Sequence, residues 1–213
     1  MATGEPTPES LTQPLARYAL AVRPGFLVAT AGACLLGLAT AATGVRFHPG
    51  LAALTVLGAL LVHAGINVLN DYYDALAGTD WRDSDRIFPY PGGSRFIQNG
   101  VLSPEQTRAY GWGLLGAGAA AGLVLAALRG PELLAMGLAG LVVGWAYSAP
   151  GLRLSGRGLG ELAVAVGFGV LMPLGTDWVQ RGELHWLPIV AGVPFGVLTA
   201  NLLFLNQFPD YRA

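Results

Sequence analysis

The sequence contains few charged residues, one cysteine and no lysine. Asp, Glu, Lys and Arg make up 12% of the chain, against about 25% in a typical soluble protein. The single cysteine, Cys34, has no partner within the chain, which excludes a disulfide-rich scaffold. A formal net charge of −1 gives no general attraction to nucleic acids. The motifs of P-loop, zinc-protease, CxxC redox and GxSxG esterase sites are also absent.

Hydrophobic residues make up 53% of the chain and form long runs without charge. Six such runs lie between charged clusters, and a helix needs about 20 apolar residues to cross a bilayer. One run could be a core helix of a soluble protein, but six in a row leave too few charges for a soluble surface. The runs lack the polar–apolar alternation of a β-barrel. We therefore predict an all-α, polytopic membrane bundle with six transmembrane helices, near residues 24–44, 51–73, 108–128, 132–149, 160–179 and 186–208.

The arginines are divided unevenly between the two ends of these helices. Six helices place both termini on one side, and that side carries nine of the twelve arginines: Arg17, Arg23, Arg82, Arg86, Arg95, Arg108, Arg153, Arg157 and Arg212. The positive-inside rule predicts that this side, with the N-terminus, faces the cytoplasm of a bacterial-type cell membrane. We expect residues 1–14 to form a flexible polar tail and residues 15–213 to form the membrane domain.

Amides and acids cluster at the end of the second predicted helix: Asn67, Asn70, Asp71 and Asp74, with Asp80 six residues further on. Spacings of three and four residues place the helical members along one face, so their oxygens can converge. Such hard oxygen ligands suit Mg²⁺, which commonly also binds a substrate phosphate. Capping explains these acids poorly, because a negative charge at a helix C-terminus opposes the helix dipole. His63, earlier on the same helix, is better interpreted as a packing residue than as a base.

A second cluster, Asn206 and Asp210, repeats the four-residue spacing at the end of the sixth helix. Helix parity predicts that it faces the same side as Asp71. Two clusters across one cavity would hold two metal ions or a metal–diphosphate complex.

Basic and hydroxyl side chains lie in the loops on the same side. Ser94 and Arg95 follow two glycines, and Arg153 and Arg157 lie between the fourth and fifth helices. We interpret these four residues as diphosphate-binding. For the arginines, topology signalling and contact with lipid headgroups are competing interpretations. Gly111, Gly113, Gly116 and Gly118 predict close helix packing.

The sequence Asn70-Asp71-x-x-Asp74, with the later Asn206-x-x-x-Asp210, resembles the motifs of the UbiA superfamily of intramembrane prenyltransferases. Other segments are similar to the 1,4-dihydroxy-2-naphthoate prenyltransferases of menaquinone synthesis: Arg23-Pro24, GGSR at 92–95, YSAP at 147–150 and GTDWVQ at 175–180. The chain departs from the family pattern in having Gly78 where many members have an acid, and Asn206 where they have Asp. Family members typically have nine membrane helices, so we expect this chain to match the first six, as a C-terminally incomplete domain.

The resemblance implies Mg²⁺-dependent transfer of a polyprenyl group from polyprenyl diphosphate to an aromatic acceptor, 1,4-dihydroxy-2-naphthoate. It implies that Asp71, Asp74 and Asp210 are catalytic, and that Arg23 and Tyr147 bind the acceptor. Membrane lipids are the other expected partner. Another acceptor, such as 4-hydroxybenzoate, would use the same metal site. Two competing hypotheses are a membrane cation transporter and a non-catalytic lipid-binding subunit.

Overall fold

The computed structural model describes residues 5–78, 94–148, 151–152 and 154–207, which form helices and turns with no β-strand among them. In chain order the elements are α1 (Pro14–Ala21), α2 (Pro24–Ala42), α3 (Pro49–Ala77), α5 (Pro104–Arg129), α6 (Glu132–Ser148), the 3₁₀ turn η1 (Leu154–Arg157), α7 (Gly160–Val166), the π-helical segment η2 (Gly167–Leu171), α8 (Met172–Arg181) and α9 (Leu187–Gln207). The predicted all-α fold is confirmed. Asp80, Arg153 and Asp210 lie outside the described residues.

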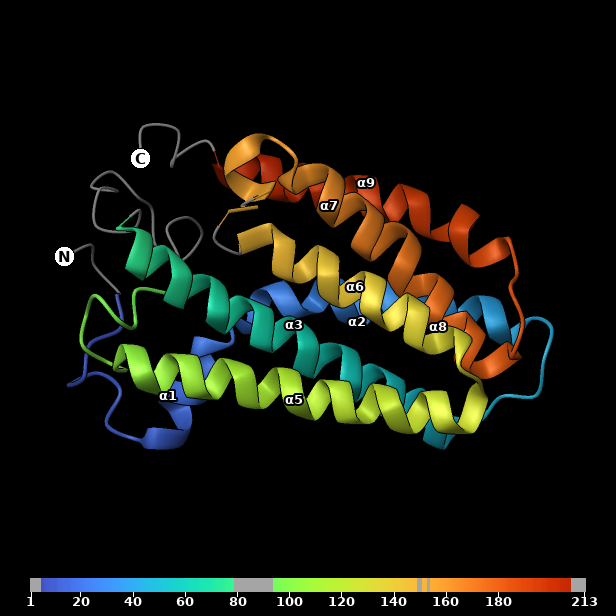
Figure 1. The fold of residues 1–213 in the computed structure, drawn as a ribbon, viewed down its shortest axis with the longest axis horizontal. Coiled ribbons are helices and arrows are strands. Elements are labelled where there is room, and N and C mark those ends of the chain that lie inside the picture. Colours follow the sequence, from blue (N-terminus) through green and yellow to red (C-terminus); the bar gives the residue numbers. More distant parts are fainter. Residues whose placement is uncertain (1–4, 79–93, 149–150, 153, 208–213) are drawn as a thin grey trace.

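Among the described residues, five helices are long and apolar enough to cross a membrane: Pro24–Ala42, Pro49–Ala77, Pro104–Arg129, Gly160–Arg181 and Leu187–Asn206. The sixth, α6, is shorter but equally apolar in character, over Glu132–Tyr147. Successive helices run in opposite directions along the bundle (Figure 1). The ends of α3, α6 and α9 therefore share one end of the bundle with the starts of α2, α5 and α7. The predicted six-helix membrane bundle is confirmed, and the ends of α3 and α9, which carry the predicted polar clusters, lie at the same end of it.

Proline and glycine set several helix boundaries. Pro24, Pro49 and Pro104 occupy first-turn positions, where the missing N–H costs nothing. Ser103 begins α5 with a capping box, in which its Oγ accepts a hydrogen bond from the Gln106 N–H. Gly78 ends α3 with a φ of 74°, a left-handed conformation that favours glycine. The residue found where many family members have an acid is thus the helix C-cap.

Glycines bring α3 and α5 into close contact. A Cβ at Gly111 would lie 2.7 Å from Leu69 Cγ, and one at Gly118 would lie 2.6 Å from Val62 Cγ2. Both glycines therefore do what the sequence predicts, which is to let two helix backbones approach. Gly113 and Gly116 meet nothing within 4 Å and take no part in this contact.

The short helix α1 is an element that the sequence analysis missed. Its residues join a small core with Val68 of α3 and with Phe96, Val101 and Leu102 from the segment before α5. Asn99 Nδ2 donates to Glu5 Oε2 at 3.1 Å and to the Pro6 carbonyl at 3.0 Å. This core fixes the start of α2 and the 94–102 segment against the C-terminal half of α3. The division into a tail and a domain at residue 14 stays a prediction.

Candidate active site

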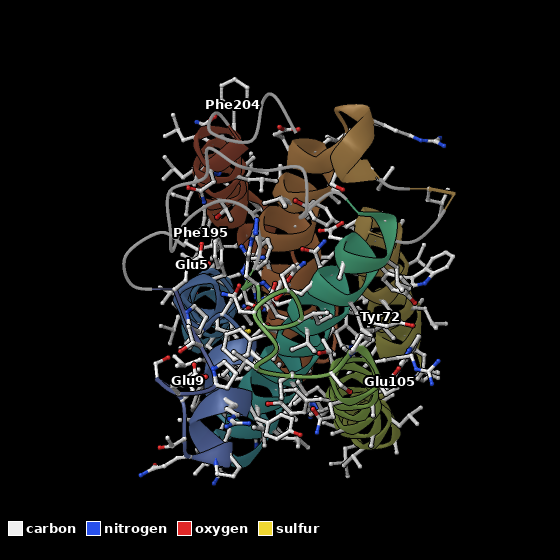
Figure 2. The ribbon with its side chains drawn as sticks, turned by 90° about the vertical axis from the view of Figure 1, so that its left-hand side faces the viewer. Glu5, Glu9, Tyr72, Glu105, Phe195 and Phe204 are labelled. Atoms are coloured by element: carbon white, nitrogen blue, oxygen red, sulfur yellow. The ribbon has the colours of Figure 1, made fainter. Side chains whose placement is uncertain are left out.

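A large cavity of about 1450 Å³ lies between the membrane helices, with walls from α2, α3, α5, α6, α7, η2, α8 and α9. Most lining residues are apolar or glycine, and Phe195 and Phe204 of α9 are among them. Figure 2 views the molecule from the end where α3, α6 and α9 finish and labels both phenylalanines. The polar lining residues include Arg23, His63, Asn67, Asn70, Asp74, Tyr147, Ser155 and Asn206. An apolar cavity with polar groups drawn largely from the helix ends suits an amphipathic ligand.

Asn70 and Asp74 are paired along α3. The Asn70 Nδ2 donates a 2.9 Å hydrogen bond to Asp74 Oδ2, and both half-buried side chains line the cavity. Asn206, at the end of α9, lines the same cavity. The structure therefore brings Asn70 and Asp74 of the first predicted cluster and Asn206 of the second to a common space.

Asp71, three residues before Asp74, contacts other segments of the chain. Its carboxylate is only 5% exposed, and it is not among the residues that line the cavity. Its two oxygens accept from the Ser94 backbone N–H at 3.3 and 3.2 Å, and Arg23 Nη1 lies 3.8 Å from Oδ1. Asn67, one turn earlier, lines the cavity and donates from Nδ2 to the Val22 carbonyl at 3.0 Å. Asp71 thus connects α3 to two other segments of the site.

Arg23 stands at the start of α2 and lines the cavity. Its backbone has a φ of 56°, and its guanidinium lies 4.5 Å from the ring centroid of Phe26, a cation–π distance. Tyr147 lines the cavity from the end of α6, and its carbonyl accepts a 2.9 Å hydrogen bond from Ser155 Oγ. Both residues that the resemblance assigns to the acceptor therefore face one cavity.

The loop residues predicted to bind diphosphate differ in their burial and in their hydrogen-bond partners. Ser94 is buried, and its N–H is bound by Asp71, so the Ser94–Arg95 turn is attached to the end of α3. Arg157 is exposed and donates from Nη2 to the Gly151 carbonyl of its own loop at 2.7 Å. Neither Ser94 nor Arg157 is among the residues that line the cavity. Their diphosphate role stays a prediction.

Three further residues belong to the cavity wall, His63, Ser155 and Phe168, and of these the sequence analysis interpreted only His63, as a packing residue. Thr30 Oγ1 and His63 Nδ1 form a 2.6 Å hydrogen bond between α2 and α3, and the His63 ring packs edge-on against Phe168 at 5.3 Å. Phe168 belongs to the π-helical segment η2, a rare element that is often found at functional sites. Ser155 lines the cavity beside Tyr147. Only His63 carried a sequence signal, its position on the same helix as Asn67.

The donor set around Asp74 suits a hard divalent cation. Carboxylate and amide oxygens are ligands that Mg²⁺ accepts, and Mg²⁺ usually retains waters or substrate phosphate in the rest of its shell. Within the described residues, no three His, Cys, Asp or Glu side chains lie together as a metal site. The residues of the described chain that fit the metal are therefore one acid, Asp74, with the amides Asn67, Asn70 and Asn206.

The fold and cavity define a helical, membrane-embedded protein with a polar cluster at one end of a large apolar chamber. The chain belongs to the UbiA prenyltransferase family, whose sequence profile matches residues 30–213. The predicted resemblance is confirmed at the level of the family. No solved structure is significantly similar to the chain.

The chain is similar to curated proteins of two names. The chain is 35% identical over 160 residues to a 1,4-dihydroxy-2-naphthoate octaprenyltransferase of Mycobacterium tuberculosis, covering 75% of this chain and 52% of the relative. It is 29% identical over 197 residues to the protein of the same name from Mycobacterium leprae, covering 92% and 64%. It is also 29% identical over 202 residues to UbiA prenyltransferase domain-containing protein 1 of Danio rerio, covering 92% and 56%. The chain thus spans between half and two thirds of the length of these relatives.

Proposed function

We propose that this chain forms the catalytic chamber of a membrane prenyltransferase. It would transfer a polyprenyl group from polyprenyl diphosphate to 1,4-dihydroxy-2-naphthoate, in menaquinone synthesis. The observation that carries the proposal is the cavity itself, in which Asn70, Asp74, Asn206 and Arg23 border a largely apolar space. The two mycobacterial relatives support the choice of acceptor by their names.

The polar end of the cavity would bind the diphosphate. Asn67, Asn70, Asp74 and Asn206 would hold Mg²⁺, with Asp80 and Asp210 as further predicted ligands. When bound, Mg²⁺ neutralises charge on the diphosphate and so makes pyrophosphate a better leaving group. Arg23 lines the same space and offers a fixed positive charge, and Arg95 and Arg153 are predicted to add to it.

The apolar part of the cavity would hold the prenyl chain. Gly137, Gly140 and Leu141 of α6 line it together with Leu198 and Leu202 of α9, and the volume of about 1450 Å³ leaves room for several isoprene units. In a membrane such a chain leaves lipid and not water, so its binding energy comes from van der Waals contacts with these walls. This binding energy would hold the reacting carbon at the polar end.

In the reaction, the allylic C–O bond of the donor breaks and its electron pair leaves with pyrophosphate. A ring carbon of the acceptor attacks the resulting allylic cation, and the naphthoate ring regains aromaticity by losing its carboxyl group as CO₂. The Arg23 guanidinium, which has several N–H donors, would bind the acceptor carboxylate as well as the diphosphate, and the Tyr147 ring would stabilise the cation through its π-face. The apolar walls exclude water, which would otherwise capture the cation.

We further propose that this polar end faces the cytoplasm. The support is the arginine distribution, since the sequence predicts nine of the twelve arginines on this side. Cysteine labelling with a membrane-impermeant maleimide would test it, with a cysteine introduced at Glu105 and another at Glu183. The proposal requires labelling of the Glu183 position in intact cells and of the Glu105 position only after cell lysis.

The activity is tested with membranes that contain the full-length gene product. Labelled farnesyl diphosphate and 1,4-dihydroxy-2-naphthoate are supplied with Mg²⁺, and the labelled product is identified by mass spectrometry. We expect a prenylated naphthoquinol that has lost the carboxyl group. Parallel reactions with 4-hydroxybenzoate distinguish the acceptor, because product from that ring alone would overturn the naphthoate assignment. Absence of product with either ring would contradict the prenyltransferase activity toward these acceptors.

A further inference from the structure

Two residue pairs with the same spacing project in different directions from α3. Asn67 and Asp71 form one pair and Asn70 and Asp74 the other, and each pair is separated by four residues. A helix advances about 100° per residue, so the two pairs point about 60° apart. Asn70 and Asp74 both line the cavity. In the other pair, Asn67 also lines the cavity and donates to the Val22 carbonyl, whereas Asp71 does not line it and contacts Arg23 at the start of α2.

The contacts of Asp71 are those of a carboxylate that organises its neighbours. It accepts hydrogen bonds from the Ser94 N–H on both oxygens and attracts the Arg23 guanidinium, while it is 5% exposed. Hydrogen bonds and charge attraction of this kind are strong where water is largely excluded. One side chain on α3 therefore holds two segments that are distant from each other in the sequence.

Both of those segments adopt a backbone conformation that needs outside support. Arg23 and Arg95 have φ values of 56° and 59°, and among the described residues they are the only positive-φ positions that are not glycine. Left-handed backbone at a residue with a Cβ is unfavourable and persists where surrounding contacts enforce it. Arg23 itself contacts Asp71, and Arg95 directly follows the Ser94 N–H that Asp71 binds.

We propose that Asp71 is a positioning residue for the two arginines and not a ligand of the metal. It holds the Arg23 guanidinium at the cavity wall and fixes the Ser94–Arg95 turn over the end of α3, while Asp74 supplies the carboxylate for the cation. This role rests on the proposed function, and it replaces the metal-binding role that the sequence predicts for Asp71. Diphosphate binding then depends on Asp71 through Arg23, whereas metal binding does not.

The test measures ligand-induced thermal stabilisation of the purified full-length gene product in detergent, so it needs no turnover. Mg²⁺ is titrated at saturating inorganic pyrophosphate, and pyrophosphate is titrated at saturating Mg²⁺. The variants are Asp71→Asn, Asp74→Asn, Arg23→Gln and the double variant Asp71→Asn with Arg23→Gln. Glu105→Gln is the matched control, because it makes the same change at an exposed position at this end of the bundle (Figure 2).

For Asp74→Asn we expect the Mg²⁺ concentration at half-saturation to rise at least about tenfold. Asp71→Asn should leave the Mg²⁺ concentration at half-saturation within about twofold of that of the unchanged protein. It should weaken pyrophosphate binding about tenfold, as expected for a lost charged hydrogen-bond partner. Arg23→Gln should reproduce the Asp71→Asn effect, and the double variant should lose little more than either single variant.

Three results would overturn the role of Asp71. The first is that Asp71→Asn raises the Mg²⁺ concentration at half-saturation as much as Asp74→Asn does. The second is that the double variant loses pyrophosphate affinity by the full sum of the two single losses. The third is that Arg23→Gln binds pyrophosphate normally. The third result tests the role of Asp71 even if the Asp71→Asn protein does not fold, because the Arg23→Gln protein keeps Asp71. If Asp74→Asn also leaves the Mg²⁺ titration unchanged and no variant alters pyrophosphate binding, the proposed function fails as well, since the metal and the diphosphate are then bound elsewhere.

Discussion

Thr40 Oγ1 donates a 2.9 Å hydrogen bond to Asp177 Oδ2 and so joins α2 to α8 at the end of the bundle opposite the candidate active site. Arg181 completes this contact, since its Nε lies 2.9 Å from Asp177 Oδ1 and its Nη2 donates to the Thr40 carbonyl at 3.0 Å. The Asp177 carboxylate is fully buried. A buried acid with a bidentate arginine and a hydroxyl donor is well compensated, so this contact holds α2 and α8 together.

The first prediction concerns this buried pair. Asp177→Asn leaves the Arg181 guanidinium with a neutral partner and should lower the free energy of unfolding by about 3 kcal/mol. Unfolding of the purified protein in mixed micelles, followed by circular dichroism against denaturant, measures the loss. The matched control is Glu183→Gln in the exposed loop beyond α8, which should change stability by less than about 0.5 kcal/mol. Equal free energies of unfolding for the two variants would show that the Asp177–Arg181 pair does not stabilise the protein.

The second prediction separates two glycines of one helix. A methyl group at Gly118 would meet Val62 Cγ2 at 2.6 Å and the Gly58 carbonyl at 3.0 Å, so Gly118→Ala must push α3 and α5 apart. We expect a loss of about 1–3 kcal/mol, typical of overpacking. Gly116→Ala, which meets nothing within 4 Å, should be neutral or slightly stabilising. The melting temperatures of the two proteins, measured side by side, give the difference. Equal melting temperatures for Gly118→Ala and Gly116→Ala would contradict the close packing.

The membrane helices and much of the cavity's polar end could be predicted because both depend on local information. Charged residues are excluded from the bilayer, so the gaps between them locate helices. The spacing of Asn70 and Asp74 places them on one helix face, and the structure shows that face lining the cavity. Helix parity correctly put the end of α9 at the same end as that of α3.

What could not be predicted depends on contacts between distant segments. Asn67–Asp71 and Asn70–Asp74 have the same spacing, and only the docking of Ser94 and Arg23 against α3 distinguishes them. Helix α1 is too short for a clear periodic pattern, and it is stabilised by packing against Val68 and Phe96. Likewise, the sequence near Arg157 does not reveal that its guanidinium bonds to the Gly151 carbonyl.

The third prediction tests the binding of the prenyl chain. Gly137 lines the cavity and has open space where a Cβ would be, so Gly137→Leu should fill part of the chamber without disturbing the helix. We expect the KM for octaprenyl diphosphate to rise about tenfold, with little change for geranyl diphosphate, because only the longer chain reaches this region. The control is Gly113→Leu, at an exposed position of α5 that is equally open. Equal KM changes for the two donors would contradict this location of the chain.

The fourth prediction concerns removal of the metal. Membranes stripped with EDTA should lose prenyl transfer completely, and added Mg²⁺ should restore it, because without the cation the pyrophosphate leaves with its full negative charge. Asp74→Asn should lower kcat at least about 100-fold, since the described part of the chain offers no other acid among the residues that line the cavity. Excess Mg²⁺ should recover part of this loss if the amide oxygens of Asn70 and Asn206 still hold the ion weakly. Transfer that persists in EDTA, with Asp74→Asn as active as the unchanged protein, would mean that the leaving group is stabilised by the arginines alone.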